Sequence, residues 1–191
     1  MQTQSYQPIS APLLDPQAPA GDEQRVADIF NAIQERIGFI PDGLRLYSLS
    51  PPLLETFVGN VTYFNGGGTE LSAELTAMIR YLVSWQSGCA FCVDMNEAVL
   101  VDKLGLELDQ VRAARTNPEL APLADKDKAL LRVALKAANN PEFVSQQDLD
   151  AARQQGWKDR DLFDTVVQAA SMRAFNIVLR TFKVEHQGAF A

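Results

Sequence analysis

The sequence has 191 residues, of which 47% are hydrophobic and 21% are charged, a composition that allows one globular domain or two small ones. Seventeen Lys and Arg residues against twenty-four Asp and Glu residues give a formal net charge of -7. Such a chain repels polyanions unless a local basic patch compensates, so we expect no nucleic-acid partner.

No export or membrane signal is visible in the sequence. The first basic residue is Arg25, and no apolar run of the signal-peptide kind precedes it. The apolar stretches fall short of the ~20 residues that a spanning helix needs. Two cysteines are too few for a secreted disulfide framework. We therefore expect a cytoplasmic protein without membrane association, in which a close cysteine pair is available for redox chemistry.

The first 21 residues have the composition of an arm. They contain five residues that disfavour helices and strands: Pro8, Pro12, Pro16, Pro19 and Gly21. This pattern predicts a flexible N-terminal arm over residues 1–21 and a helical domain over residues 22–191.

From Asp22 onward, apolar residues recur at helical spacing between capping residues and glycines. The predicted helices cover approximately residues 22–37, 50–64, 72–87, 89–104, 109–115, 125–138, 145–155 and 161–182. No stretch shows the alternation of apolar and polar residues that a hairpin would need, so the sequence predicts an all-α fold.

A weak internal similarity suggests a duplicated helical unit. When Gly105 is aligned with Gly156, Ile79 falls on Leu130, and the helix-turn-helix patterns that precede the two glycines coincide. The second unit has no cysteine at the matching positions. Only the first unit carries a redox pair.

The chemistry of the sequence is concentrated in Cys89-Ala90-Phe91-Cys92, which begins a helix just after Gly88. Residues three apart on a helix share a face and lie near enough for a disulfide. Unsatisfied N–H groups and the helix dipole at this end also favour thiolates. The position therefore predicts a reactive pair.

Three structural explanations compete with redox chemistry. A disulfide that closes so short a loop adds little stability. A zinc site needs four ligands, whereas the chain has two cysteines and one histidine, His186. Cysteines are also common in apolar cores, although two at this spacing favour a functional pair. We expect no metal and no bound cofactor.

Several motifs together resemble the AhpD-like, peroxidase-related members of the carboxymuconolactone decarboxylase superfamily. They are Ile37-Gly38-Phe39-Ile40-Pro41, Ser50-Pro51-Pro52-Leu53-Leu54, Leu71-Ser72-Ala73-Glu74, the segment from Gly88 to Cys92, Leu104-Gly105 and Phe175-Asn176. The resemblance covers roughly residues 25–185. It implies an AhpD-like helical fold, a homo-oligomer of three or six chains, and peroxide or disulfide reduction driven by a dithiol or a thioredoxin-like protein.

The resemblance also implies roles for the cysteines. Cys92 would be attacked by the peroxide and pass through a sulfenic acid, and Cys89 would resolve it as a disulfide. Dipole reasoning alone instead favours Cys89, which is nearer the helix start, as the more thiolate-like residue.

Two positions depart from the family pattern. The family places a His four residues after the second Cys and a Glu about three turns before the first, where this chain has Asn96 and Ala77. Neither side chain accepts a proton near pH 7, so the departure predicts a slow peroxidase. Glu74, one turn before Ala77, is a candidate substitute, and Asp94 and Glu97 are weaker candidates because each is more often a solvated carboxylate.

Three functions therefore compete. The first is a thiol oxidoreductase with Cys92, Cys89, Asn96 and Glu74 in its site. The second is a lyase of the carboxymuconolactone decarboxylase kind, against which the cysteine pair argues. The third is a non-catalytic or redox-sensing helical oligomer, which the missing His and Glu favour.

Overall fold

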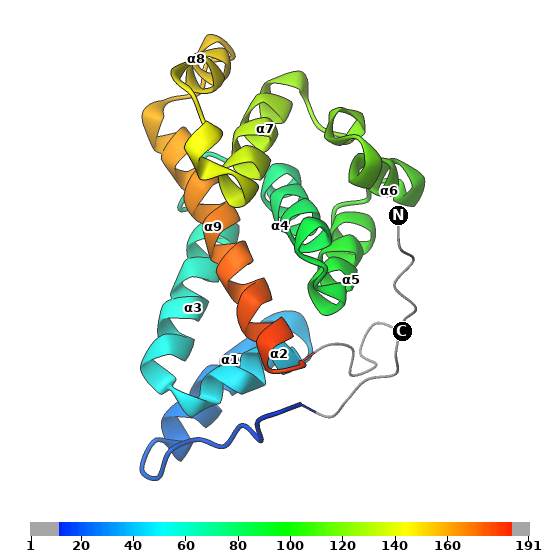
Figure 1. Cartoon of the computed structure of the whole chain (residues 1–191). Helices are drawn as coiled ribbons and strands as arrows, with labels where there is room; N and C mark the ends of the chain where they lie inside the picture. The colour runs from blue at the N-terminus through cyan, green and yellow to red at the C-terminus, as the bar shows by residue number, and fades with distance from the viewer. Residues whose placement is uncertain (1–11, 185–191) are drawn as a thin grey trace. The chain divides into compact units, whose positions relative to one another are not determined.

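The computed structural model describes residues 12–184, which form α-helices joined by short turns (Figure 1). No strand occurs in that range, so the predicted all-α fold is confirmed. No helix in the same range combines the length and apolar character that crossing a lipid bilayer requires. The described part of the chain divides into two compact units, one of residues 12–59 with 179–184 and the other of residues 60–178.

The first unit contains α1 (Glu23–Ile37), α2 (Asp42–Leu46) and the beginning of α3 (Pro51–Asn65). Its core consists of Val26, Leu44 and Leu54, packed against partly buried aromatic and aliphatic side chains of the same helices. α1 ends at Gly38, whose φ of 87° is readily available to glycine alone. Asp22 stands at the predicted N-cap position, but its carboxylate contacts Arg25 instead of capping the helix.

The described part of the predicted arm contains no helix. Within the first unit, its Leu13 N–H donates to the carbonyl of Phe182 over 2.9 Å. Residues 1–11 and His186 lie outside the described residues. The boundary between an arm and a domain at residue 22 stays a prediction.

The second unit contains the end of α3 and most of α9 (Asp159–Thr181), with five further α-helices between them. These are α4 (Ala73–Ser87), α5 (Ala90–Ala98), α6 (Leu108–Thr116), α7 (Asp125–Asn139) and α8 (Gln146–Gln154). α4 is the central helix, with ten buried residues, and it packs against α5 and α7 (Figure 1).

Two of the predicted helix starts have the side-chain caps that the sequence indicates. The Ser72 hydroxyl accepts a hydrogen bond from the N–H of Leu75 at the start of α4. Ser145 and Asp148 form a reciprocal capping box at the start of α8. Short polar side chains satisfy N–H groups that have no partner within the helix. Because this requires particular residue types at the first positions, these helix starts can be predicted from the sequence.

The helix predicted to run to Leu104 changes form on the way. After α5 the chain continues as a π-helical turn, η2 (Val99–Lys103), before it ends at Gly105. The N–H of Leu104 bonds to the carbonyl of Val99, five residues back. In a π-helix each N–H bonds to the carbonyl five residues back, whereas in an α-helix it bonds to the carbonyl four residues back. In so short a segment, the spacing of hydrophobic residues does not reveal this difference.

The residues that the internal similarity aligns have similar burial and similar backbone conformation in the structure. Ile79 and Leu82 on α4 are fully buried, and so are Leu130 and Val133 on α7. Gly105 and Gly156 both have positive φ, at 71° and 94°. The duplication remains a hypothesis, since equivalent burial does not establish common descent.

Candidate functional site

The two cysteines lie where α4 gives way to α5. α4 ends at Gly88 in a left-handed conformation with φ of 67°, which turns the chain sharply and makes Cys89 the N-cap residue of α5. The N–H of Cys89 is held by the carbonyl of Ser84 at 3.1 Å, and its own carbonyl accepts the N–H of Val93 at 2.9 Å. The predicted placement at a helix start is confirmed.

The two sulfur atoms face each other in the protein interior. Cys89 Sγ lies 2.7 Å from Cys92 Sγ, and both residues are fully buried. The positive end of the α5 dipole favours a thiolate here, whereas burial opposes it. The geometry needed for exchange between a thiol and a sulfenic acid or disulfide is therefore present. Which sulfur is attacked first stays a prediction.

Asn96 lies one helical turn beyond Cys92, at the position where the family resemblance expects histidine. It is 1% exposed. Its amide nitrogen donates to the carbonyl of Cys92 over 2.7 Å, and its amide oxygen accepts from Arg80 Nε over 3.0 Å. Both ends of the amide are occupied, and Asn96 is not a proton acceptor. Ala77, at the position of the expected Glu, is fully buried on α4.

Arg80 is a residue of this site that the sequence analysis missed. Besides Asn96, its guanidinium contacts the amide oxygen of Asn65 from Nη1 at 3.2 Å. Burial lowers the pKa of Arg80 to about 10, so the side chain is still charged at neutral pH. The available signal was a single arginine in a predicted helix of mostly apolar residues.

Glu74 is not brought to the thiols. It lies in the first turn of α4, thirteen residues before the end of the helix at Ser87, or about 20 Å along its axis. Its electrostatic neighbour is Asp127 on α7. Burial raises the pKa of Asp127, and the negative charge of Glu74 adds to that rise.

Glu97 is also engaged elsewhere. Its carboxylate accepts hydrogen bonds from Tyr81 at 2.8 Å, Arg112 at 2.8 Å and Arg115 at 2.6 Å. Burial alone would raise the pKa of Glu97, but the hydrogen bonds from Arg112 and Tyr81 and the charge of Arg115 outweigh it and hold the pKa below its ordinary value. A carboxylate so strongly paired is a poor general base.

Solved structures with this arrangement of helices are known. An uncharacterised peroxidase-related protein from Silicibacter sp. TM1040 has a TM-score of 0.81 and 22% identity, over 99% of this chain and 96% of that one. The AhpD core of an uncharacterised peroxidase-related protein from Ralstonia eutropha JMP134 has a TM-score of 0.75 and 23% identity, over 97% and 96%. The chain has the AhpD-like fold.

The AhpD-like fold is shared with proteins of different chemistry. A debrominase crystallised in complex with 2,3,4-tribromopyrrole has a TM-score of 0.66 and 16% identity, over 92% of this chain and 90% of that one. At these identities the likeness concerns the fold, and activity has to be argued from the site. No protein-family model and no curated protein matches the sequence.

In this AhpD-like chain, α4 and α9 meet along polar side chains. Ser84 contacts Asn176 at 3.3 Å, Arg173 donates to the Ser87 hydroxyl at 2.8 Å, and Thr69, just before α4, donates to Asp164 at 2.9 Å. The residue just before α4 contacts the first part of α9, and residues near the end of α4 contact the later part of α9. The two helices therefore run in the same direction. We call the following polar residues of the two helices the polar seam: Thr76, Arg80, Ser84 and Ser87 on α4, and Thr165, Gln168, Arg173 and Asn176 on α9.

The polar seam contains buried groups without hydrogen-bond partners among residues 12–184. They are Thr76 Oγ1, Thr165 Oγ1, Gln168 Oε1 and one end of the Asn176 amide. Thr76 lies eight residues before Ser84, and Gln168 lies eight residues before Asn176, so each is about 12 Å along its own helix from the contact between Ser84 and Asn176. Buried polar groups of this kind call for water or a ligand.

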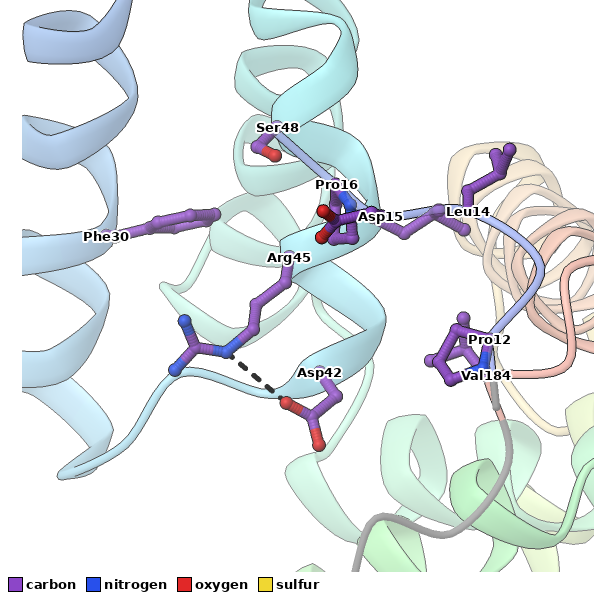
Figure 2. A pocket seen from close by; sticks show the side chains of 10 residues that line it. Pro12, Leu14, Asp15, Pro16, Phe30, Asp42, Arg45, Ser48 and Val184 are labelled. Atoms are coloured by element: carbon purple, nitrogen blue, oxygen red, sulfur yellow. Dashed lines mark ion pairs between the residues drawn. The ribbon is translucent and has the colours of Figure 1, made fainter. Parts of the chain in front are cut away.

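A separate cavity of about 460 Å³ lies in the first unit, remote in sequence from the cysteines. Figure 2 shows Phe30 from α1 on one side and the ion pair between Arg45 and Asp42, 3.3 Å apart, on another. The residues that line it include neither Cys nor His. It contains no nucleophile comparable to the thiol pair.

The described part of the chain contains no set of ligands for a metal ion. Residues 12–184 contain no group of three or more His, Cys, Asp or Glu side chains placed to hold a metal ion. The candidate site is therefore the thiol pair together with Asn96 and Arg80.

Proposed function

We propose that the chain is a thiol oxidoreductase that reduces peroxides through Cys92 and Cys89 and is regenerated by a dithiol or a thioredoxin-like protein. The observation that carries the proposal is the pair of buried sulfurs 2.7 Å apart at the start of α5, within an AhpD-like fold. The reaction needs no bound cofactor.

The chemistry proceeds in three balanced steps. The Cys92 thiolate attacks the terminal oxygen of a hydroperoxide, which forms an S–O bond, breaks the O–O bond and releases an alkoxide that takes up a proton as alcohol. The Cys89 thiol then attacks the sulfenic sulfur, and a disulfide forms as water leaves. An external dithiol returns both cysteines to thiols by exchange and is itself oxidised to a disulfide.

For the first step, the chain lacks the histidine and the glutamate that the family resemblance expects at two positions near the cysteines. Asn96 and Ala77 stand in their places, and general acid–base help contributes on the order of a hundredfold to ten-thousandfold. We therefore expect slow turnover with a proton supplied by solvent.

Thiol titration tests the proposal. A stoichiometric pulse of hydrogen peroxide should remove two thiols from the parent, and a sulfenic acid should be trapped on Cys92 in the Cys89→Ser variant. Cys92→Ser, which keeps the other thiol in the same helix turn, is the matched control and should trap none. The proposal would be overturned if both thiols of the parent persist while a known peroxidase, tested in a separate sample, consumes the same peroxide.

A redox sensor is the second candidate, and the full engagement of the Asn96 amide favours it. A sensor would be oxidised once per chain, and because its disulfide is exchanged slowly, it would add little to the peroxide that dithiothreitol consumes by itself. An enzyme would continue to consume peroxide in proportion to the dithiol supplied.

We also propose that the chain forms a homo-oligomer through α9. The exposed face of this helix is apolar, with Phe163 67% and Ile177 58% exposed and the small residues Ala170 and Ala174 between them. These residues recur at helical spacing and form one stripe. A stripe of this kind on a helix whose opposite face is buried fits a second copy of the same chain.

A further inference from the structure

We propose that Arg80, assisted by Arg173, makes the thiol site selective for organic hydroperoxides that carry a carboxylate. The inference rests on the proposed peroxide reduction and names the substrate class of that same site.

Arg80 is a half-buried cation whose partners are neutral. It uses Nε and Nη1 on the amide oxygens of Asn96 and Asn65, and Nη2 has no acceptor among residues 12–184. No carboxylate of that range lies within ion-pair distance of it, whereas Arg115 on α6 is paired with Glu97 at 2.6 Å. A shielded charge without a counter-ion is costly, and an anionic ligand offsets that cost.

Arg173 adds a second positive charge near the segment that carries the thiols. Its Nη1 donates to the hydroxyl of Ser87, which lies two residues before Cys89, and it forms no ion pair with any described carboxylate. Arg80 approaches the other cysteine through Asn96, which bonds to the carbonyl of Cys92. In a chain of net charge -7, these two arginines make the surroundings of the thiols locally positive and attractive to an anion.

Of the polar seam, Asn176 lies close to the thiols, because it contacts Ser84, whose carbonyl accepts the N–H of Cys89. Thr76, Gln168 and Asn176 are each at least nine-tenths buried, and each has a polar atom without a partner in the described part of the chain. A buried amide group without a partner at this place favours a ligand that carries oxygen atoms over a plain alkyl chain.

Helix geometry limits the length of the substrate. Arg80 bonds to Asn96, which lies one turn of α5 from Cys92, or about 6 Å along the axis. A carboxylate bound to the guanidinium would thus place its peroxide on Cys92 if a short spacer such as a benzene ring separates the two groups. A charge-assisted bond to the carboxylate orients the substrate as well as binding it.

The test compares three compounds that carry the same hydroperoxide group: cumene hydroperoxide, its para-carboxylate derivative, and the methyl ester of that derivative. We expect the parent to lose thiols about tenfold faster with the carboxylate than with the ester, as charge-assisted recognition predicts. Arg80→Met should reduce this ratio towards one, and Arg80→Lys should keep part of it. Arg132→Met is the control, because Arg132 pairs with Glu119 on the exposed surface and should leave the ratio at the parent value.

Binding of the unreactive analogue 4-isopropylbenzoate, measured by calorimetry, separates this inference from the proposed function. Binding that Arg80→Met weakens about tenfold supports the anion site even if no peroxide is reduced. The inference is overturned if the parent shows equal rates for acid and ester and does not bind the analogue. It is also overturned if a folded Arg80→Met variant retains the parent ratio and affinity.

Discussion

Arg80 on α4 donates from Nε to the amide oxygen of Asn96 on α5 over 3.0 Å, at the position where the family resemblance expects a proton-accepting histidine. Asn96 thus stands in the place of the base, Ala77 stands in the place of the carboxylate, and the partner of Asn96 is the Arg80 cation. The Asn96 amide is also fixed from its other end by the carbonyl of Cys92. Arg80 supplies a positive charge and Asn96 is held in a fixed orientation beside Cys92, but the two side chains cannot relay a proton.

Asn96→His should raise peroxide consumption roughly tenfold to a hundredfold at neutral pH. The neighbouring charge of Arg80 disfavours a second cation, so the imidazole stays neutral and able to accept a proton. Ala77→Glu combined with Asn96→His should exceed the product of the single effects, because a base needs an orienting partner. Steady-state peroxide consumption measures this, with circular dichroism as a check on folding. A folded double variant no faster than the parent would favour the sensor function.

Asp148→Asn should destabilise the chain by about 0.5–1 kcal/mol at pH 7. The bonds from Lys136 and Ser145 lower the pKa of Asp148 to about 2, below its unfolded value of 3.8. Its stabilising contribution is therefore complete above about pH 4 and is lost as pH falls towards 2. Urea unfolding at pH 7, 4 and 3 should show the difference from the parent shrinking as the solution is acidified. A difference that is constant over this range would contradict the assignment.

Asp127→Asn should have the opposite pH dependence. Burial raises the pKa of Asp127, so the stability linked to its protonated form is lost as pH rises through that pKa. Asparagine does not ionise and can still accept the bond from the Ser72 hydroxyl, which is 3.1 Å long. The variant should gain a few tenths to about 1 kcal/mol relative to the parent between pH 4 and pH 7. Thermal melts at both pH values check the sign, and a relative loss at pH 7 would exclude it.

Phe163→Glu combined with Ile177→Glu should convert the proposed oligomer to the 21.0 kDa monomer. Two carboxylates placed in an apolar interface would have to be desolvated, which costs several kcal/mol. Phe143→Glu is a matched control, because Phe143 is 65% exposed but lies outside α9. Light scattering at micromolar concentration distinguishes the species. A parent that is already monomeric would remove the basis for an interface at α9.

Most of the helices were predictable because their signals are local. Ser72 and Ser145 cap helices with their own hydroxyls, and Gly38 and Gly88 end helices through backbone conformations that other residues adopt with difficulty. The closeness of Cys89 and Cys92 was predictable for the same reason, since it depends on three residues of one helix.

The surroundings of the thiols were not predictable in this way. The sequence offered Glu74, and more weakly Glu97, as partners of the cysteines, and only packing shows Glu74 beside Asp127 and Glu97 between two arginines. A side chain's role at a site depends on which helix faces it, and spacing along one helix carries no information on that.

The sequence by itself determined the helical elements and a thiol pair at a helix start, because both follow from interactions within about four residues. Only the tertiary structure decided that Arg80 meets Asn96 across sixteen residues, and that Ser84 meets Asn176 across ninety-two. Those contacts depend on the relative packing of α4, α5 and α9. That packing is set by the burial of whole helix faces, which no single motif in the sequence specifies.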